Sequence, residues 1–356
     1  MLVNLLNNLD LTKYEITLFT LFKEGVNRHR LRPEIKQVYI FKSVFRGNVF
    51  VQRLFSPFFL FKYLIRDNYD LIVAYQEGIM TRLISGCRNK STKKVAWIHI
   101  EMKEINEFIS VYKNYQEMKN AYENFDLIVG VSKVIVESFE KKNIINNPNL
   151  KVLYNTNLTK EITELSKEPL DIELDKNKIN LITVGRLVQQ KGYDRLLKVV
   201  RRLKEEEIKQ FCLYIIGTGE MHNELLNYVD NYQLHKYVSF LGFKNNPYKY
   251  ISSSDLFVCS SYNEGFSTAV SESVILNTPV ITTDCSGMRE LFGDNEYGYI
   301  VENDENSLYE GLKALLLNRE LICYYKTRTM QRSTFFSTTQ TVQEVENTFD
   351  KLLNVK

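Results

Sequence analysis

The chain has 356 residues, of which 44% are hydrophobic and 25% charged, as expected for a globular protein with room for two domains. It contains no run of about 18 apolar residues that could span a membrane, and its first residues lack the features of a signal peptide. Five scattered cysteines and four histidines form no metal-ligand pattern, so we expect buried free thiols in a reducing cytoplasm.

The net charge of +3 is distributed unevenly along the chain. Residues 1–160 hold 24 Lys and Arg against 15 Asp and Glu, which is a net charge of +9, and the remainder holds 22 against 28, which is −6. A basic first half indicates that this part of the protein faces something anionic.

In chain order, residues 2–10 predict a helix, and six apolar segments then predict strands. These segments are residues 14–21, 35–41, 70–76, 93–100, 126–132 and 150–155, and amphipathic stretches at 115–125 and 132–142 predict helices between some of them. A doubly wound domain normally opens with a strand and a tight glycine turn. Because this chain opens with the helix, we expect that first strand to be missing.

A polar stretch at 159–178, rich in acids and lysines, is the predicted interdomain segment. The pattern then restarts, with strands predicted at 179–187, 211–217, 238–243, 255–261, 278–284 and 297–302 and helices at 193–207 and 223–233. We predict two doubly wound α/β domains, 1–160 and 161–330, and a helical segment, 331–356, that returns to the first domain. The cleft between the domains is the expected ligand site.

Two cations follow the predicted strand at 179–187. Gly185 and Arg186 end this strand, and Lys191 and Gly192 precede a helix that begins near Tyr193. Cations beside a helix N-terminus suit a diphosphate, although a loop Arg and Lys in water is the plainer alternative.

Glycines also end the next predicted strand, at Gly217 and Gly219. They fit a backbone that passes close to a ligand. They fit an ordinary strand-to-helix turn equally well.

Two carboxylates lie in the segment EGFSTAVSESV, residues 264–274. Glu264 lies in the loop after a predicted strand, Ser267 or Thr268 can cap the next helix, and Glu272 lies one turn further in. Glu272 can be explained as complementing the helix dipole, but Glu264 lies outside that helix. Since carboxylates bind vicinal hydroxyls well, two cations and two acids together predict a nucleotide-sugar site.

The motifs VGRLVQQKGYDRLL, IIGTGE, LGF, SSYNEGFSTAVSESV and TPVITTDCSGMREL resemble, in order and separation, the retaining glycosyltransferases of family 4. The resemblance covers residues 180–302, and in the first half it rests on the looser matches VAWIHI, DLIVGVS and KVLYN. It implies a GT-B fold, with two Rossmann-like domains facing a central cleft. It also implies transfer from a nucleotide-diphospho-sugar to an acceptor hydroxyl, with retention at the anomeric carbon.

The resemblance also assigns roles by position. Glu264, which would hold hydroxyls of the donor sugar, and His99, which would lie near the reacting sugar, are the expected catalytic residues. The expected donor-binding residues are Gly185, Arg186, Lys191, Gly217, Gly265, Phe266, Ser267, Thr268 and Glu272. Among these, Arg186 and Lys191 would hold the diphosphate and Glu272 the ribose.

Alternatives remain for the two catalytic residues. Glu264 as a covalent nucleophile ranks below a hydroxyl-binding role, because a carboxylate that already binds hydroxyls is badly placed for backside attack. His99 can also be explained as a satisfied polar residue at a strand end. Because fixed cations stabilise the leaving diphosphate, we expect no metal and no cofactor. The expected donor is a UDP-sugar, with a GDP-sugar as the alternative.

Residues 35–66 contain no acid, and six cations lie there among many aromatic residues. This composition suits a membrane interface, although a buried strand and helix with solvated charges would also explain it. Nucleic acid is disfavoured because the aromatics are mostly Phe among apolar neighbours. The resemblance favours the membrane, because bacterial members of the family often act on lipid-linked sugars. We therefore expect a cytoplasmic protein, peripheral on the inner face of the cytoplasmic membrane.

The sequence thus predicts a retaining glycosyltransferase that acts on a lipid-linked or saccharide acceptor in the synthesis of cell-surface polysaccharide, such as capsule or lipopolysaccharide, or of glycolipid. The alternative is a non-catalytic nucleotide-sugar-binding homologue that works as a partner subunit. The family's glycine-rich loop, which follows its first strand, is expected to be missing here. A true absence of that loop would favour the partner subunit.

Overall fold

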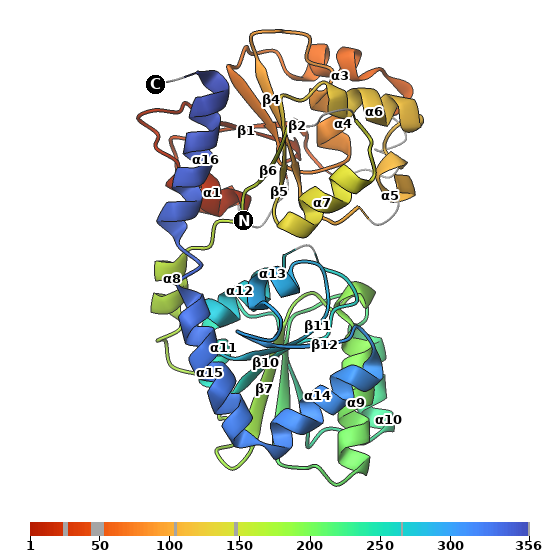
Figure 1. Ribbon diagram of the computed structural model, residues 1–356, viewed down its shortest axis with the longest axis vertical. Coiled ribbons are helices and arrows are strands. Elements are labelled where there is room, and N and C mark those ends of the chain that lie inside the picture. The colour runs from red at the N-terminus through yellow and green to blue at the C-terminus, as the bar shows by residue number, and fades with distance from the viewer. Residues whose placement is uncertain (24–27, 44–52, 103–104, 146–148, 265, 355–356) are drawn as a thin grey trace. The chain divides into compact units, whose positions relative to one another are not determined.

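The computed structural model describes all residues except 24–27, 44–52, 103–104, 146–148, 265 and 355–356, and the chain forms two compact units (Figure 1). The N-terminal unit comprises residues 1–156 and 338–356, and the C-terminal unit comprises residues 157–337. The sequence-based boundaries lay after residues 160 and 330. The last helix belongs to the same unit as the first residues.

The N-terminal unit contains two parallel sheets. One has the strand order β3 (Leu71–Ala74), β4 (Lys93–Ile98), β5 (Leu127–Gly130) and β6 (Leu150–Val152), and the other pairs β1 (Thr17–Phe22) with β2 (Lys36–Phe41). The described helices are α1 (Leu2–Asn8), η1 (Arg28–Arg30), α3 (Pro57–Leu64), α4 (Ile79–Ile84), α5 (Ile105–Ile109), α6 (Tyr115–Glu123), α7 (Lys133–Lys141) and α16 (Thr338–Leu353). Each strand predicted in this half is present.

Local sequence explains where two of these helices begin. The Asn114 side chain accepts a hydrogen bond from the Glu117 amide at the start of α6, and the Ser132 side chain accepts one from the Ile135 amide at the start of α7. Such caps satisfy amides that have no partner within the helix.

Helix α16 packs beside the residues that follow α1 (Figure 1). The Tyr14 and Phe349 rings meet edge to face, with 6.4 Å between their centroids, and Lys13 forms an ion pair with Asp350. These contacts attach the end of the chain to the N-terminal unit.

The C-terminal unit is built on a six-stranded parallel sheet. Its strand order is β12 (Tyr299–Val301), β11 (Val280–Thr283), β10 (Leu256–Cys259), β7 (Ile179–Val184), β8 (Phe211–Ile216) and β9 (Val238–Gly242). The chain moves outward from β7 in one direction through β8 and β9, and in the other through β10, β11 and β12. The strand order therefore reverses between β7 and β10, and ligands bind doubly wound sheets at such a switch point.

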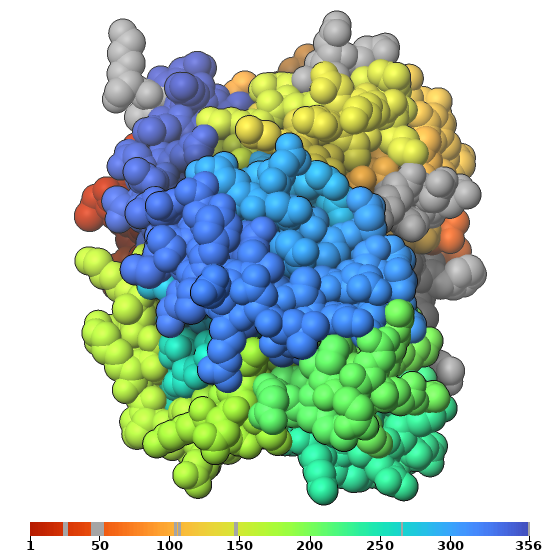
Figure 2. All heavy atoms as spheres, turned by 60° about the horizontal axis from the view of Figure 1, so that its bottom comes forward, coloured from red at the N-terminus to blue at the C-terminus, as the bar shows by residue number. Residues whose placement is uncertain are grey.

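Helices cover both faces of this sheet. The helices α9 (Tyr193–Glu205), α10 (His222–Asn231) and α14 (Glu305–Leu317) lie on one side, and α11 (Tyr248–Ser253), α12 (Thr268–Ile275) and α15 (Arg319–Ser333) lie on the other (Figure 1). In the space-filling view, α14 and α15 (blue) and α9 and α10 (green) form a continuous surface (Figure 2). Leu181, Leu213 and Val258 on the central strands are completely buried, as in a parallel sheet covered on both faces.

Residues 159–178, the predicted interdomain segment, pack on the C-terminal unit. They begin with helix α8 (Thr159–Leu165), and the Asn246 side-chain amide donates to the Leu165 carbonyl at 2.8 Å. Further along, Asp171 forms an ion pair with Lys244 at 2.8 Å and accepts a hydrogen bond from Tyr250. The polar composition that predicted a linker instead supplies surface contacts within one unit.

Two expectations from composition can be compared with the described residues. None of the helices described here is long and apolar enough to cross a membrane. All five cysteines are free, but the expectation that they are buried is wrong for Cys323, which is exposed, and for Cys212, which is half-buried.

Candidate active site

Two loops meet at the switch point of the C-terminal sheet. The loop after β7 contains η2 (Gln189–Lys191) and leads into α9, and the loop after β10 begins at Ser260. The Tyr262 amide donates to the Gln190 carbonyl at 2.8 Å, and the Ser260 hydroxyl donates to the Lys191 carbonyl at 3.0 Å. Between them, Gly192 has a φ of +63°, and a Cβ there would lie 2.0 Å from the Ser260 carbonyl oxygen. Only glycine therefore allows the loops to approach this closely.

An ion pair between Lys191 and Glu264 joins the two loops. The Lys191 ammonium lies 2.6 Å from Glu264 Oε1, and the Ser261 hydroxyl donates to the same oxygen at 2.6 Å. The Glu264 side chain is 8% exposed and the Lys191 side chain 23%. A carboxylate this deeply buried needs charged and hydrogen-bonding partners, and these two residues supply them. The structure thus brings together two of the predicted site residues.

The second oxygen of Glu264 differs from the first. Both donors contact Oε1, and no described residue donates to Oε2. A carboxylate has about four acceptor positions, so Glu264 keeps acceptor capacity for a ligand hydroxyl. Lys191 likewise has three donor hydrogens, and Glu264 is its single side-chain partner among the described residues.

Arg195 on α9 supports the loop after β10. Its guanidinium is buried and donates to the carbonyls of Ser260, at 2.7 Å, and Ser261, and it lies 4.1 Å from the centroid of the Tyr262 ring. Burial lowers the pKa of Arg195 from its usual value. Since a buried charge without hydrogen bonds is costly, this residue and the loop hold each other in place.

Three further predicted residues lie at the ends of β7 and β8. Gly185 directly follows β7, and a Cβ there would lie 3.7 Å from Lys191 Cε. Arg186 is exposed, and the structure describes no side-chain partner for it. Gly217 has a φ of +145°, and a Cβ there would lie 1.9 Å from the Gly185 carbonyl oxygen. Close contact between two protein backbones is therefore sufficient reason for glycine at 217.

The start of α12 differs in part from the prediction. Ser267 occupies the N-cap position and Thr268 is the first helical residue, but neither side chain caps the helix. Phe266 and Ser267 are buried, and Gly265 lies outside the described residues. The prediction that Ser267 or Thr268 caps α12 is therefore wrong.

Glu272 lies in the second turn of α12, apart from the ion pair. It accepts a hydrogen bond from the Tyr248 hydroxyl of α11 at 3.2 Å. Burial raises the pKa of Glu272 to about 7. This carboxyl group therefore titrates near neutral pH, and any ligand that donates hydrogen bonds to it favours the charged form.

His99 lies in the N-terminal unit, directly after β4. Its Nε2 lies 2.9 Å from the Tyr75 carbonyl oxygen, and its backbone amide donates to the Glu77 carboxylate at 3.0 Å. Since a carbonyl only accepts, Nε2 carries the proton and Nδ1 is an acceptor. Burial lowers the pKa of His99 to about 4, so the ring is neutral at physiological pH. This arrangement suits a hydrogen-bond acceptor better than a proton donor.

Sequence reasoning missed Ser261, Arg195 and Tyr248. A detectable signal existed for Arg195, which lies among buried positions in the segment YDRLL of α9, where an exposed arginine would break the apolar face. Ser261 carries no distinguishing signal even though its partner Glu264 lies 3 residues away in the same loop, and the partner of Tyr248 lies 24 residues away in another helix.

A doubly wound C-terminal unit with a cationic and acidic pair at its switch point is the architecture of glycosyltransferases with the GT-B fold. Residues 166–332 match the family model described as Glycosyl transferases group 1. Over 279 residues, the chain is 36% identical to the N-acetylgalactosamine-N,N'-diacetylbacillosaminyl-diphospho-undecaprenol 4-alpha-N-acetylgalactosaminyltransferase of Campylobacter jejuni, covering 78% of this chain and 72% of that protein. The chain belongs to the group 1 glycosyl transferases.

Solved structures agree on the fold. Anabaena Alr3699/HepE in complex with UDP and glucose is similar with a TM-score of 0.74 and 14% identity, over 98% of this chain and 94% of that one. Staphylococcus aureus TarM, in a complex that contains UDP, is similar with a TM-score of 0.64 and 17% identity, over 83% of this chain but only 58% of that one. The predictions of a GT-B fold and of a glycosyltransferase are confirmed.

Proposed function

We propose that this glycosyltransferase transfers a sugar from a UDP-sugar to a lipid-linked or saccharide acceptor, with retention at the anomeric carbon. The observation that carries the proposal is the Lys191–Glu264 pair at the switch point, with 2.6 Å between Nζ and Oε1. A cation and a carboxylate held side by side match the two chemistries of the donor, an anionic diphosphate and a polyhydroxylated sugar.

The chemistry assigns a part to each group. The bond between the anomeric carbon and the diphosphate oxygen breaks, negative charge develops on the diphosphate, an acceptor hydroxyl oxygen forms the new bond, and the hydroxyl proton passes to the leaving diphosphate oxygen. Lys191 stabilises the leaving charge because Glu264 fixes it before the reaction begins, and Arg186, in the same loop after β7, adds a second positive charge. Glu264 accepts hydrogen bonds from sugar hydroxyls through Oε2, and neutral His99 accepts one through Nδ1. A retained configuration follows when the acceptor attacks from the side that the leaving group vacates.

The proposed donor is a UDP-sugar, since HepE and TarM were both solved with UDP. The proposed acceptor is a lipid-linked sugar, since the Campylobacter relative is named for a diphospho-undecaprenol acceptor. A lipid-linked acceptor requires work at a membrane surface, and the basic, aromatic stretch at 35–66 supports this. Because the site has two cations for the diphosphate, we propose that no metal is needed.

A direct test combines UDP-N-acetylgalactosamine with a short-chain prenyl-diphosphate-linked N-acetylgalactosamine. We expect a disaccharide product whose anomeric coupling constant in proton NMR shows the α configuration of the donor, at a rate that EDTA leaves largely unchanged. GDP-sugars serve as the control donors. A β-linked product would contradict retention, and loss of activity in EDTA that Mn²⁺ restores would contradict the metal-free site.

A second candidate function, the non-catalytic partner subunit, receives no support from the family. The same assay decides between the two. A protein that raises its melting temperature with UDP-sugars but transfers nothing to any soluble acceptor would favour the partner subunit over the enzyme.

Glu272 provides a pH test of the proposed ribose contact. Ribose hydroxyls donate hydrogen bonds, so they bind the carboxylate, which accepts through two charged oxygens, more tightly than the carboxylic acid. With a pKa of about 7, the charged fraction rises about tenfold between pH 6 and pH 8, and we expect the affinity for UDP to rise by about the same factor. Calorimetric titration of UDP at several pH values measures this rise.

The matched control is Glu272→Gln, which should bind UDP with no such pH dependence. In the ligand-free protein, Glu272 makes the stability depend on pH in the opposite direction. Since the folded-state pKa lies above the value of 4.5 for an exposed Glu, the protein binds more protons folded than unfolded, and its free energy of unfolding decreases as the pH rises from about 5 to about 8. If the wild type and the variant share one pH profile in both measurements, Glu272 does not contact the nucleotide.

A further inference from the structure

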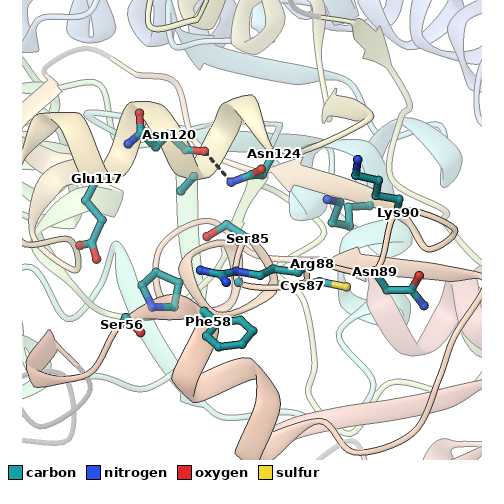
Figure 3. A pocket seen from close by; sticks show the side chains of 14 residues that line it. Ser56, Phe58, Ser85, Cys87, Arg88, Asn89, Lys90, Glu117, Asn120 and Asn124 are labelled. Atoms are coloured by element: carbon teal, nitrogen blue, oxygen red, sulfur yellow. Dashed lines mark hydrogen bonds between the residues drawn. The ribbon is translucent and has the colours of Figure 1, made fainter.

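A cavity of about 630 Å³ lies in the N-terminal unit. Its walls are the start of α3, the residues that follow α4, and α6 (Figure 3). Lys94, the second residue of β4, lines it, whereas His99 follows the last residue of the same strand. The cavity and His99 therefore lie at opposite ends of β4, and the cavity is separate from the candidate catalytic residue.

Cations dominate the charge of this cavity. Arg88, Lys90 and Lys94 line it, and within the part of the chain that the structure describes none of their side chains forms an ion pair with a carboxylate, although the Lys94 backbone amide donates to Asp126 at 2.8 Å. The one acid in the lining, Glu117, is already occupied. The buried Arg82 guanidinium lies 2.9 Å from it, and the Lys113 backbone amide donates to it at 2.6 Å. The cavity therefore offers three unmatched positive charges to an anion.

Exposed aromatic side chains adjoin the cavity on α3 and just before it. Phe55, Phe59 and Tyr63 are spaced four residues apart and stack along one face, with ring centroids 5.3 Å and 4.3 Å apart. Tyr63 is 55% exposed, and Leu54, next to this row, is 61% exposed. Phe58 connects this surface with the cavity, since it lines the cavity and the Arg88 guanidinium lies 3.9 Å from its ring centroid (Figure 3). The alternative of a buried helix at 35–66 is therefore wrong for α3.

We propose that this cavity binds the phosphate-bearing headgroup of an anionic phospholipid while the aromatic face of α3 lies in the interfacial layer of the bilayer. Rings such as Phe and Tyr favour that layer, and cations beside them attract anionic lipid. A monomeric soluble protein rarely leaves so many adjoining aromatic side chains in water without a partner. The inference rests on the proposed function only for the presence of a membrane, because the cavity lies at the opposite end of β4 from His99. The lipid bound here anchors the enzyme and is not the acceptor.

The test uses the full-length protein and sedimentation with vesicles of phosphatidylcholine, with or without phosphatidylglycerol. We expect binding that requires phosphatidylglycerol and weakens with salt. Arg88→Glu/Lys90→Glu should weaken it by roughly 10-fold to 30-fold or more, and Phe59→Ser/Tyr63→Ser should weaken binding to the vesicles that contain phosphatidylglycerol. Lys236→Glu/Lys326→Glu makes the same change in net charge in the C-terminal unit, at two exposed positions, and should bind as the wild type does.

Several outcomes would overturn the proposal. Equal weakening by the two charge-reversing variants would mean that net charge alone drives binding. Binding of soluble glycerophosphate without any binding to vesicles would mean a site for a free phosphate ester. RNA binding that Arg88→Glu/Lys90→Glu abolishes would mean a nucleic-acid surface. UDP affinity and transfer to a soluble acceptor are measured on the same preparations. If transfer fails while vesicle binding follows the pattern above, the proposed function fails and this inference stands.

Discussion

Lys191→Ala is expected to weaken binding of UDP by about 10-fold to 100-fold while leaving the binding of uridine unchanged. A hydrogen bond from a charged group to another charged group contributes about 1.5–3 kcal/mol, and uridine has no phosphate for Lys191 to contact. Turnover should fall with affinity, because the same charge stabilises the leaving diphosphate in the transition state. Calorimetric titration measures the affinities for UDP and for uridine, and steady-state kinetics measures the turnover.

The structure suggests a competing explanation, which the double variant tests. Lys191 lies 2.6 Å from Glu264 Oε1, so its removal also leaves a buried carboxylate whose one remaining side-chain donor among the described residues is Ser261. If Lys191 served only to hold Glu264, then Lys191→Ala/Glu264→Gln would bind UDP as tightly as Glu264→Gln alone. We expect it to bind UDP as weakly as Lys191→Ala. Unchanged UDP affinity in Lys191→Ala would remove this residue from the diphosphate site.

For Glu264→Gln we expect the two quantities to separate. The kcat should fall roughly 100-fold to 1,000-fold, and the UDP affinity should stay nearly unchanged. The amide keeps the shape of the side chain and accepts through one oxygen only. The sugar hydroxyls that Oε2 would bind lose a charged acceptor, at the stage when the ring changes shape and charge. Glu264→Asp is the matched control, because it keeps the charge but moves it, and it should fall between the wild type and Glu264→Gln.

Mass spectrometry of the wild type distinguishes the two roles considered for Glu264, hydroxyl binding and covalent catalysis. As a hydroxyl-binding residue it forms no covalent bond, so mass spectrometry of the wild type with donor and without acceptor should show no glycosylated protein. A glycosyl adduct on Glu264 would establish a covalent nucleophile. A kcat within a few-fold of the wild type in Glu264→Gln would mean that the carboxylate is only the structural partner of Lys191.

The sequence by itself determines the fold of this protein more fully than it determines the site. Strands such as 179–187 and helices such as 193–207 were predictable, because apolar periodicity and turn residues are local properties of the chain. The observed strand β7 (Ile179–Val184) and helix α9 (Tyr193–Glu205) lie within those ranges. The motif order was equally informative, since it predicted a glycosyltransferase, which the relatives confirm.

Only the tertiary structure decided which side chains meet. Lys191 and Glu264 are 73 residues apart, and their contact depends on β7 and β10 being neighbours in the sheet, which no local pattern encodes. The same strand order places buried Arg195 under the loop after β10 and gives Gly217 a backbone neighbour in Gly185. The exposure of Phe59 and Tyr63 was also decided by packing, because an aromatic residue looks the same in sequence whether a neighbouring element covers it or leaves it at the surface.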